Sequence, residues 1–360
     1  MKISIPNQRL KPILKRIAAV VPRKAVLPAL EMILVETKDN KLILHYTDLE
    51  ITVSCEVPMA DGVVVKDDKL LIPFQWLKGI SDLHESEILT IDLYKSKAEI
   101  EASSGTYRQD IAVKLTDYPA LPAMPDSHKV AMIDGFAKWL KAASKVCVFS
   151  EATPSMNMVY LELIGESMIM TATDANALFT HQFAIDKVFV DTAVLVSQKV
   201  VGFMEGLTDI SMHYNDDLYS FSSESISVYA KRPEHKFPAY NSIIPKADTT
   251  NLRVNRDALI AVLDKAAFIN ADVVSIKPTA DQLIFTVKNE RKQEAVLHCE
   301  CFGNTAVADT TIMVQTSKLQ TILSQIQFSF LGLTIVNATP LIVTNSEDMS
   351  YIGLLTTLKF

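Results

Sequence analysis

The sequence predicts an α+β protein of three similar domains, each with two helices packed on antiparallel strands. A helix signature recurs in the first, second and third parts of the 360-residue chain, and a second helical segment recurs later in each part. Segments typical of strands fill the remainder of each part. We expect the domains to be residues 1–122, 123–246 and 247–360.

The first helix of each domain is predicted from an aliphatic residue followed by Asn or Asp. This pattern occurs at Asn7, Asp134 and Asn255, and side chains of these types cap helix N-termini. After each cap, apolar residues return at helical spacing and so share one stripe. In the first helix these residues are Leu10, Ile13, Leu14, Ile17, Ala18 and Val21.

Second helices are expected at residues 74–83, 198–207 and 317–326, where the apolar spacing is again helical. Strands are expected at residues 41–46, 167–172 and 282–287, which are rich in β-branched and large apolar residues and follow polar turns. The joints between domains carry prolines, Pro119 and Pro238, beside aromatic residues. We expect sheets to continue from one domain into the next, because this covers strand edges.

The composition excludes several classes of protein. The chain is 49% hydrophobic and 21% charged, which is an ordinary globular composition. Its 10 glycines form neither of the glycine-rich phosphate loops, so a nucleotide-driven enzyme is disfavoured. No apolar run is long enough to cross a bilayer, and four cysteines are too few for a disulfide framework. We therefore expect a cytoplasmic protein with reduced thiols.

Positive charge is concentrated on the first helices, although the net charge is −7. Residues 7–24 contain six Lys and Arg side chains and no acidic residue, and the second domain's first helix repeats three lysines at helical spacing. The alternative is that these cations only solvate the outer face of each helix. Their repetition in equivalent places favours a shared basic surface that binds phosphates without reading bases.

Five short motifs occur in a fixed order along the chain. They are VLPAL at residues 26–30, TDLE at 47–50, DYP at 117–119, TDA at 173–175 and KFPAY at 236–240, with Pro245 beyond. Their order and spacing resemble the bacterial DNA polymerase III β subunits, the β sliding clamps, over the whole chain. No single motif is decisive, but five in register on a threefold repeat make a specific signal.

The resemblance implies three DNA-clamp domains in a chain that pairs head to tail with a second copy. The homodimer would be a closed ring with helices inside and sheets outside, and duplex DNA would pass through it. It implies a non-enzymatic processivity factor, without a cofactor, that tethers the replicative DNA polymerase and other clients after a clamp loader places it. Because retention by a ring is topological, its basic lining needs only weak, screened phosphate contacts.

Two sets of site residues follow. Lys24 matches a position where the family carries a basic residue that contacts DNA, and charge and helix face add Arg9, Lys11, Lys15, Arg16, Lys138, Lys141, Lys145 and Arg256. The resemblance also implies a hydrophobic pocket for short client peptides between the second and third domains. Its matching positions are Met156, Thr173, Leu178, Pro238, Ile243, Leu354 and Leu358. The alternative for this second set is that they are ordinary core positions.

The chain departs from the family around this pocket. Residues 175–177 read Ala-Asn-Ala where the family usually has Gly-His-Arg, and Ser242 stands where the family has Arg. The C-terminal residues 356–360 read TTLKF in place of Met-Pro-Met-Arg-Leu. We expect a pocket that takes apolar anchors but prefers a different peptide motif, as in a divergent, phage or mobile-element clamp.

At the ring seam the resemblance implies that Phe268 and Ile269 meet the neighbourhood of Tyr107 on the second copy. Exposed apolar residues at a sheet edge are explained by an interface.

Two rival interpretations remain. His298-Cys299-Glu300-Cys301 could begin a metal site, but no second ligand pair lies nearby in the sequence, so a half-buried strand is favoured and no metal is expected. The other rival is a clamp-fold interaction scaffold or inhibitor that has lost DNA encirclement. The nearly neutral third helix favours this scaffold, whereas the basic first helix opposes it.

Overall fold

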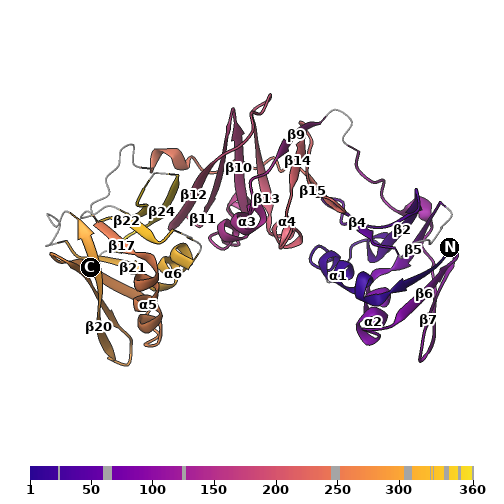
Figure 1. Ribbon diagram of the computed structural model, residues 1–360, viewed down its shortest axis with the longest axis horizontal. Coiled ribbons are helices and arrows are strands. Elements are labelled where there is room, and N and C mark those ends of the chain that lie inside the picture. Colours follow the sequence, from indigo (N-terminus) through magenta and orange to yellow (C-terminus); the bar gives the residue numbers. More distant parts are fainter. Residues whose placement is uncertain are drawn as a thin grey trace. The chain divides into compact units, whose positions relative to one another are not determined.

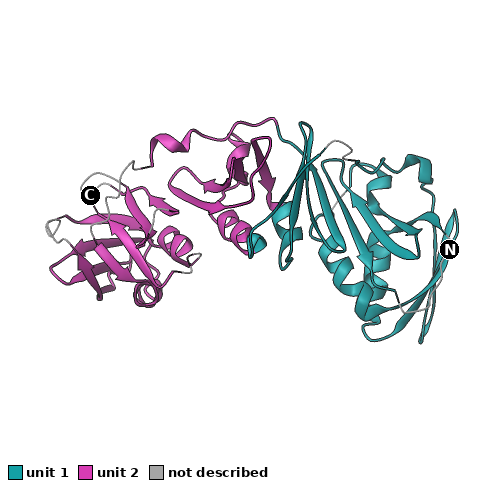
Figure 2. Cartoon of the chain, turned by 45° about the horizontal axis from the view of Figure 1, so that its top comes forward, with its two compact units in different colours: residues 1–137, 199–233 teal, residues 138–198, 234–360 magenta. Residues whose placement is uncertain are grey.

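The computed structural model describes residues 1–22, 25–59, 67–123, 127–244, 252–303, 310–324, 326, 328–335, 340–347 and 350–358. The chain forms two compact units (Figure 2): Met1–Ala137 with Lys199–Pro233, and Lys138–Gln198 with Glu234–Phe360. The boundary between the units passes through the second expected domain. The division into residues 1–122, 123–246 and 247–360 stays a prediction.

The first unit contains an eight-stranded and a four-stranded antiparallel sheet. In spatial order, the larger sheet is β5 (Asp68–Pro73), β2 (Met32–Lys38), β3 (Lys41–Thr47), β4 (Ile51–Val57), β16 (Ile226–Lys231), β15 (Leu218–Ser223), β14 (Ser211–Tyr214) and β9 (His128–Ala131). The smaller sheet is β1 (Lys2–Pro6), β6 (Ile88–Leu93), β7 (Lys97–Ala102) and β8 (Gly105–Asp110). Because β4 pairs with β16, the larger sheet joins the first and second expected domains.

Helices α1 (Asn7–Ile17) and α2 (Phe74–Leu83) lie side by side in this unit (Figure 1). The α1 stripe of Leu10, Leu14 and Ile17 is buried, as its spacing predicts. Most of α4 (Gln198–Met204) also belongs here, and short 3₁₀ turns occupy Pro28–Glu31 and Leu115–Asp117.

The second unit contains a twelve-stranded sheet. Its order is β13 (Thr192–Ser197), β10 (Met158–Ile164), β11 (Ser167–Thr173), β12 (Ala177–Ala184), β24 (Tyr351–Leu355), β23 (Leu341–Asn345), β22 (Phe330–Thr334), β17 (Leu252–Asn255), β20 (Glu294–Gly303), β19 (Gln282–Lys288), β18 (Val273–Pro278) and β21 (Ile312–Gln315). Here β12 pairs with β24, which joins the second and third expected domains. The expected continuation of sheets between domains is therefore present in both units.

Helices α5 (Arg256–Ala267) and α6 (Thr316–Ser324) pack against each other in the second unit, which also holds most of α3 (Phe136–Ser144). The buried residues of α5 return at helical spacing: Leu259, Val262, Leu263 and Ala266. Two 3₁₀ turns occupy Pro154–Asn157 and Tyr240–Ser242. No helix in the described segments is both long enough and apolar enough to cross a membrane.

The three expected helix caps have different outcomes. Asn255 caps α5, because its side chain accepts a hydrogen bond from the amide of Ala258 at 3.0 Å. The prediction for Asn7 is wrong: Pro6 precedes α1 without a side-chain cap, and Asn7 is buried. Helix α3 begins only at Phe136, and the expected second helices at 198–207 and 317–326 are shorter, at Gln198–Met204 and Thr316–Ser324.

Candidate functional site

The cations expected to face DNA lie on or beside α1, α3 and α5. Lys15, Lys138 and Lys145 are exposed and have no ion pair in the described part of the chain. Lys141 is half-buried, and Lys24 lies outside the described residues. Lys15 on α1, Lys138 on α3 and Lys145 directly after α3 therefore present unpaired positive charge to solvent.

Two further α1 cations have partners in the same unit. Arg9 donates hydrogen bonds from Nη1 to the carbonyl oxygens of Pro58 and Met59, at 3.2 and 2.6 Å. Lys11 forms an ion pair with Glu85 at 2.9 Å. Glu85 therefore partly neutralises Lys11, whereas Arg9 keeps its full charge because its partners are carbonyl oxygens.

Arg16 has a positioning role. Its Nη1 donates to the carbonyl oxygens of Phe203 and Glu205 at 2.5 and 2.9 Å, at the C-terminal end of α4. Carbonyls at this end of a helix lack intrahelical partners and attract a cation. Arg16 therefore holds α1 to α4. Arg256 is half-buried and pairs with Asp257 at 2.9 Å, which lowers its value as a free phosphate contact.

The expected peptide pocket begins at the turn between β11 and β12. The Thr173 hydroxyl donates to the carbonyl oxygen of Ala177 at 2.7 Å. Asp174 Oδ1 accepts from the amides of Asn176 and Ala177 at 2.9 and 2.6 Å, and its other oxygen accepts from Lys318 of α6. The turn is therefore held both by its own side chains and by an ion pair to a helix of the third expected domain.

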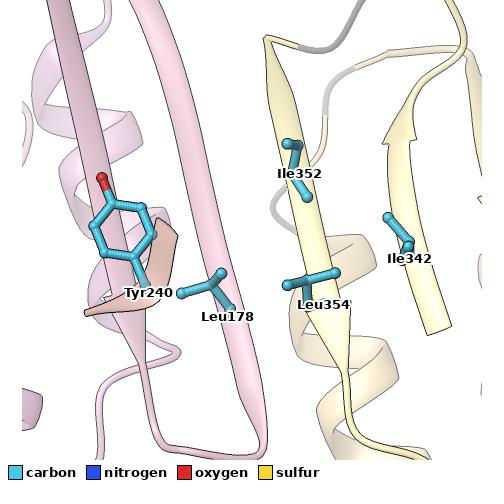
Figure 3. Packing of buried hydrophobic residues seen from close by; sticks show 5 residues of the cluster. All are labelled: Leu178, Tyr240, Ile342, Ile352 and Leu354. Atoms are coloured by element: carbon cyan, nitrogen blue, oxygen red, sulfur yellow. The ribbon is translucent and has the colours of Figure 1, made fainter. Parts of the chain in front are cut away.

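Beyond this turn lies an apolar cluster that spans the β12–β24 junction (Figure 3). Leu178 and Leu354 are direct neighbours across the two strands, and both are buried. They pack with Tyr240, Ile342 and Ile352. The structure thus brings together two of the pocket residues expected from the sequence, as part of a packed core.

The other expected pocket residues are more accessible. Ile243 is 57% exposed and Leu358 is 36% exposed, whereas Met156 and Pro238 are half-buried. The expected set therefore divides into a buried floor and an exposed rim. Its use as a pocket stays a prediction.

Aromatic residues in this region were not among the expected pocket residues. The rings of Tyr160 and Phe237 stack with centroids 4.7 Å apart and an interplanar angle of 8°. Tyr240 donates its hydroxyl hydrogen bond to Glu162, and burial raises the pKa of Tyr240. The KFPAY motif at residues 236–240 contains two of these aromatic residues, so the sequence itself could have indicated an aromatic cluster here.

Two positions where the sequence departs from the motifs of the resembled family are described by the structure. Ala175 adopts φ 70°, a left-handed conformation that glycine occupies more easily. Ser242 is exposed, and its hydroxyl donates to the carbonyl oxygen of Ala239 at 3.1 Å. Neither position supplies a cation to the rim.

The expected seam residues lie on the surface of their own units. Phe268 follows α5 and is 88% exposed, and Ile269 is half-buried. Tyr107 lies on β8, at the edge of the four-stranded sheet, and its hydroxyl is 2.8 Å from Nε2 of His84. Their role as an interface stays a prediction.

The interpretation of residues 298–301 as a half-buried strand is confirmed. His298 and Glu300 are exposed on β20, whereas Cys299 and Cys301 are buried, so the four side chains do not converge. Burial raises the pKa of Cys299 to about 11, which keeps the thiol protonated at neutral pH. The described residues contain no group of His, Cys, Asp and Glu side chains arranged to hold a metal.

Comparison with known proteins gives three results. Residues 1–122 match the family of the DNA polymerase III beta subunit, N-terminal domain. The chain is 22% identical to the beta sliding clamp of Rickettsia felis over 284 residues, which cover 76% of this chain and 74% of that protein. It is 21% identical to that of Chlamydia pneumoniae, covering 77% of each chain.

Solved structures show the same fold over the whole chain. The DnaN sliding clamp of Pseudomonas aeruginosa, solved bound to griselimycin, superposes with a TM-score of 0.88 at 17% identity and 100% coverage of both chains. The DNA polymerase III beta subunit of Thermotoga maritima gives 0.84 at 18% identity, covering 100% of this chain and 99% of that one.

Proposed function

On the premise that this chain is a divergent member of the bacterial DNA polymerase III beta subunit family, we propose that it is a DNA sliding clamp. Two copies form a ring around duplex DNA and tether the replicative polymerase and other clients. The observation that carries the proposal is the unpaired positive charge of Lys15, Lys138 and Lys145, which lie on or directly after helices of a chain whose net charge is −7. Weak phosphate contacts of this kind permit sliding.

Ring closure is supported by the strand repeat. In the first unit β4 pairs with β16, and in the second unit β12 pairs with β24. By position in the repeat, β4 and β12 correspond to β20, while β16 and β24 correspond to β8. Among the described strands, β8 pairs with β7 alone, and residues 294–300 of β20 pair with β19 alone. We therefore pair β20 of one copy with β8 of the other.

The repeat also gives a register for this seam. In the first unit, Thr52 follows the β3–β4 turn and lies opposite Tyr229 of β16. The corresponding residue after the β19–β20 turn is Glu294, and the residue of β8 that corresponds to Tyr229 is Arg108. Glu294 of one copy then lies opposite Arg108 of the other, and opposite charges in this position are favourable.

Loading on DNA tests the proposed function. Protein loaded by a cognate clamp loader onto a nicked circular plasmid should stay with the plasmid during gel filtration and be lost once a restriction enzyme linearises it. Equal loss from circular and linear DNA would refute encirclement. Together with a monomeric state, it would favour the scaffold alternative.

The role of the lysines has a charge-matched control. The triple variant Lys15→Glu, Lys138→Glu, Lys145→Glu should bind DNA more weakly, with a salt slope smaller by about 0.9 for each phosphate that is no longer neutralised. The control changes three exposed lysines on strands: Lys38→Glu, Lys97→Glu and Lys277→Glu. An equally weakened affinity in both variants would show that only net charge matters.

We place client peptides at the second junction, between the rim of Ile243 and Leu358 and the floor of Leu178 and Leu354. Leu358→Arg should weaken binding of a polymerase-derived clamp-binding peptide about tenfold or more, because it puts a charge where an apolar anchor is buried. Binding of ordinary strength that Leu358→Arg leaves unchanged would contradict both this site and an altered motif preference. Fluorescence anisotropy with a labelled peptide measures it.

A further inference from the structure

The first unit contains a cavity of about 310 Å³ at the β4–β16 junction. It is lined by the β3–β4 turn, by the crossing segment that carries Pro119, Ala120 and Pro122, and by β15 and β16. We propose that this cavity is a second peptide-docking site, which takes a short extended peptide with one side chain of leucine or phenylalanine size. The inference rests on the proposed function in treating the two junctions as equivalent sites, but its test needs no DNA.

The first argument is the turn that forms one wall of the cavity. The Thr47 hydroxyl donates to the carbonyl oxygen of Ile51 at 3.1 Å, and Asp48 Oδ1 accepts from the amides of Glu50 and Ile51 at 3.1 and 2.8 Å. The other Asp48 oxygen pairs with Lys199 of α4 at 2.5 Å. Each of these bonds has a counterpart in the turn at residues 173–177, so the two junctions share one scaffold.

The second argument is the lining itself. Strand register makes Thr52 the counterpart of Leu178, and Tyr229 the counterpart of Leu354. The crossing prolines also correspond, because Pro119 follows Tyr118 as Pro238 follows Phe237. Thr47, Thr52, Pro119 and Tyr229, which correspond to four expected residues of the second junction, all line the cavity.

The two junctions differ in the side chains at these positions. At the second junction, Leu178 and Leu354 pack with Tyr240. At the first junction Thr52 is shorter, and its hydroxyl is used internally because it donates to Thr47 Oγ1 at 2.9 Å. The space that remains is at the small end of ligand pockets, about 300–1,000 Å³. It fits an anchor side chain better than a nucleotide or a large cofactor.

The rim points to a peptide as the occupant. Glu50 and Lys231 both line the cavity, and neither has an ion-pair partner among the described residues. They are adjacent, because the Lys231 amide donates to the Glu50 carbonyl oxygen at 3.1 Å. The amide of Ala120 has no hydrogen-bond partner in the described chain. A peptide satisfies all three features. Its apolar anchor would enter the cavity, a basic and an acidic residue beside the anchor would pair with Glu50 and Lys231, and a carbonyl oxygen of its extended backbone would accept from the Ala120 amide.

The test uses a phage-displayed library of random nonapeptides panned against the full chain carrying Ala239→Arg. Ala239 is exposed and is the second-junction counterpart of Ala120, so this variant blocks the second site without disturbing a core. Enriched peptides should share one large apolar residue with charged neighbours. They should bind at least about tenfold more weakly when Ala120→Arg is added, and Ala123→Arg, an exposed change in the same segment outside the cavity lining, should leave binding unchanged.

Three outcomes would overturn the inference: no enrichment, binding that Ala120→Arg leaves unchanged, or equal weakening with Ala123→Arg. Thermal melting of each variant shows whether the protein is folded. Failure here, with clamp loading on circular DNA intact, would reject the second site and leave the proposed function standing. Failure of loading, with peptide binding intact, would reject the proposed function and leave the second site standing.

Discussion

Two asparagines in equivalent sequence patterns have different roles. Asn255 caps α5 through one hydrogen bond at its surface. Asn7 is fully buried, donates to the carbonyl oxygens of Ser81 and His84 at 2.6 and 2.8 Å, and accepts from the Ser81 hydroxyl at 2.6 Å. It joins the start of α1 to the end of α2. The local sequence predicted a cap in both places. It could not reveal the buried role of Asn7, because the partners of this side chain lie more than seventy residues away.

Alanine substitution separates these roles. Asn255→Ala should lower the free energy of unfolding by about 1 kcal/mol, the usual cost of removing a cap. Asn7→Ala should lower it by about 3 kcal/mol, because it leaves buried carbonyl and hydroxyl groups without partners. Urea denaturation measures both. Equal effects would show that the buried network adds nothing beyond capping.

A charge cluster on β2, β3 and β5, in which Glu36 and His45 are buried and Lys69 is exposed, predicts acid sensitivity. Glu36 accepts from His45 Nε2 at 3.0 Å and pairs with Lys69 at 3.0 Å, while His45 Nδ1 lies 2.8 Å from the Ser54 hydroxyl. Burial lowers the pKa of His45 from 6.5, more than Glu36 raises it. Burial alone would raise the pKa of Glu36, but Lys69 and His45 together outweigh this and lower it.

Both shifts have the same sign for stability. As the pH falls below 6.5, the unfolded chain protonates His45 before the folded chain does, and below 4.5 the same holds for Glu36. The free energy of unfolding should therefore fall from pH 7.5 to pH 5, with a contribution from His45 of at most about 1.4 kcal/mol per pH unit. Urea titrations across this range should show a shallower pH dependence for His45→Gln. An unchanged slope would contradict the role of His45.

Among the elements, β24 shows a close approach that its sequence does not reveal. A Cβ on Gly353 would lie 2.7 Å from Cγ2 of Ile322 on α6 and 3.1 Å from the Tyr351 hydroxyl. Ile322 is fully buried, and its Cγ2 would have to shift to accept the added atom. Glycine is therefore required where the junction strand passes under the helix.

Two glycine substitutions give opposite expectations. Gly353→Ala should destabilise the protein by about 1–3 kcal/mol through overpacking. Gly79→Ala is the control: it lies within α2 with open space around its Cα, so it should stabilise the protein by about 0.5–1 kcal/mol. Differential scanning fluorimetry resolves the two directions. A stable Gly353→Ala variant would mean that α6 can shift away from β24.

At this scale the sequence was a good guide to where elements lie. The helix expected at residues 74–83 is α2, and the strand expected at 282–287 is β19. Helix ends were less predictable. Helix α3 begins two residues after Asp134, and Gly135 with φ 71° lies between, so the cap residue and the turn compete for the same short segment. Packing across the junctions, as at Tyr240, depends on chain segments far apart in sequence.

For the whole molecule, the seam register gives a charge-swap prediction. Arg108→Glu should turn the dimer into monomers, because Glu294 of the second copy would then face a like charge. Glu294→Arg added to it should restore the dimer, whereas Lys97→Glu on the neighbouring strand should leave the dimer intact. Light scattering coupled to gel filtration reports the mass. Monomers in the double variant would contradict this register.

Ile269 tests the seam from the other side. Ile269→Asp places a charge in the expected apolar contact and should also give monomers. A dimer that persists at low concentration would show that this residue lies elsewhere than the interface. Sequence could suggest this surface only through resemblance, because exposure of Phe268 depends on how α5 ends in three dimensions.

An Asp–Lys ion pair at each junction within the chain indicates where the proposed ring would open. The Asp48–Lys199 and Asp174–Lys318 ion pairs stabilise the two junctions that lie within one chain. At the third, Asn289 replaces the acid in a turn one residue longer, and the first residues of α2 are Phe74, Gln75 and Trp76, none of them a cation. The proposed ring would thus lack this Asp–Lys pair at the two interfaces where separate molecules meet, and a loader would need to separate only one of these interfaces to admit DNA.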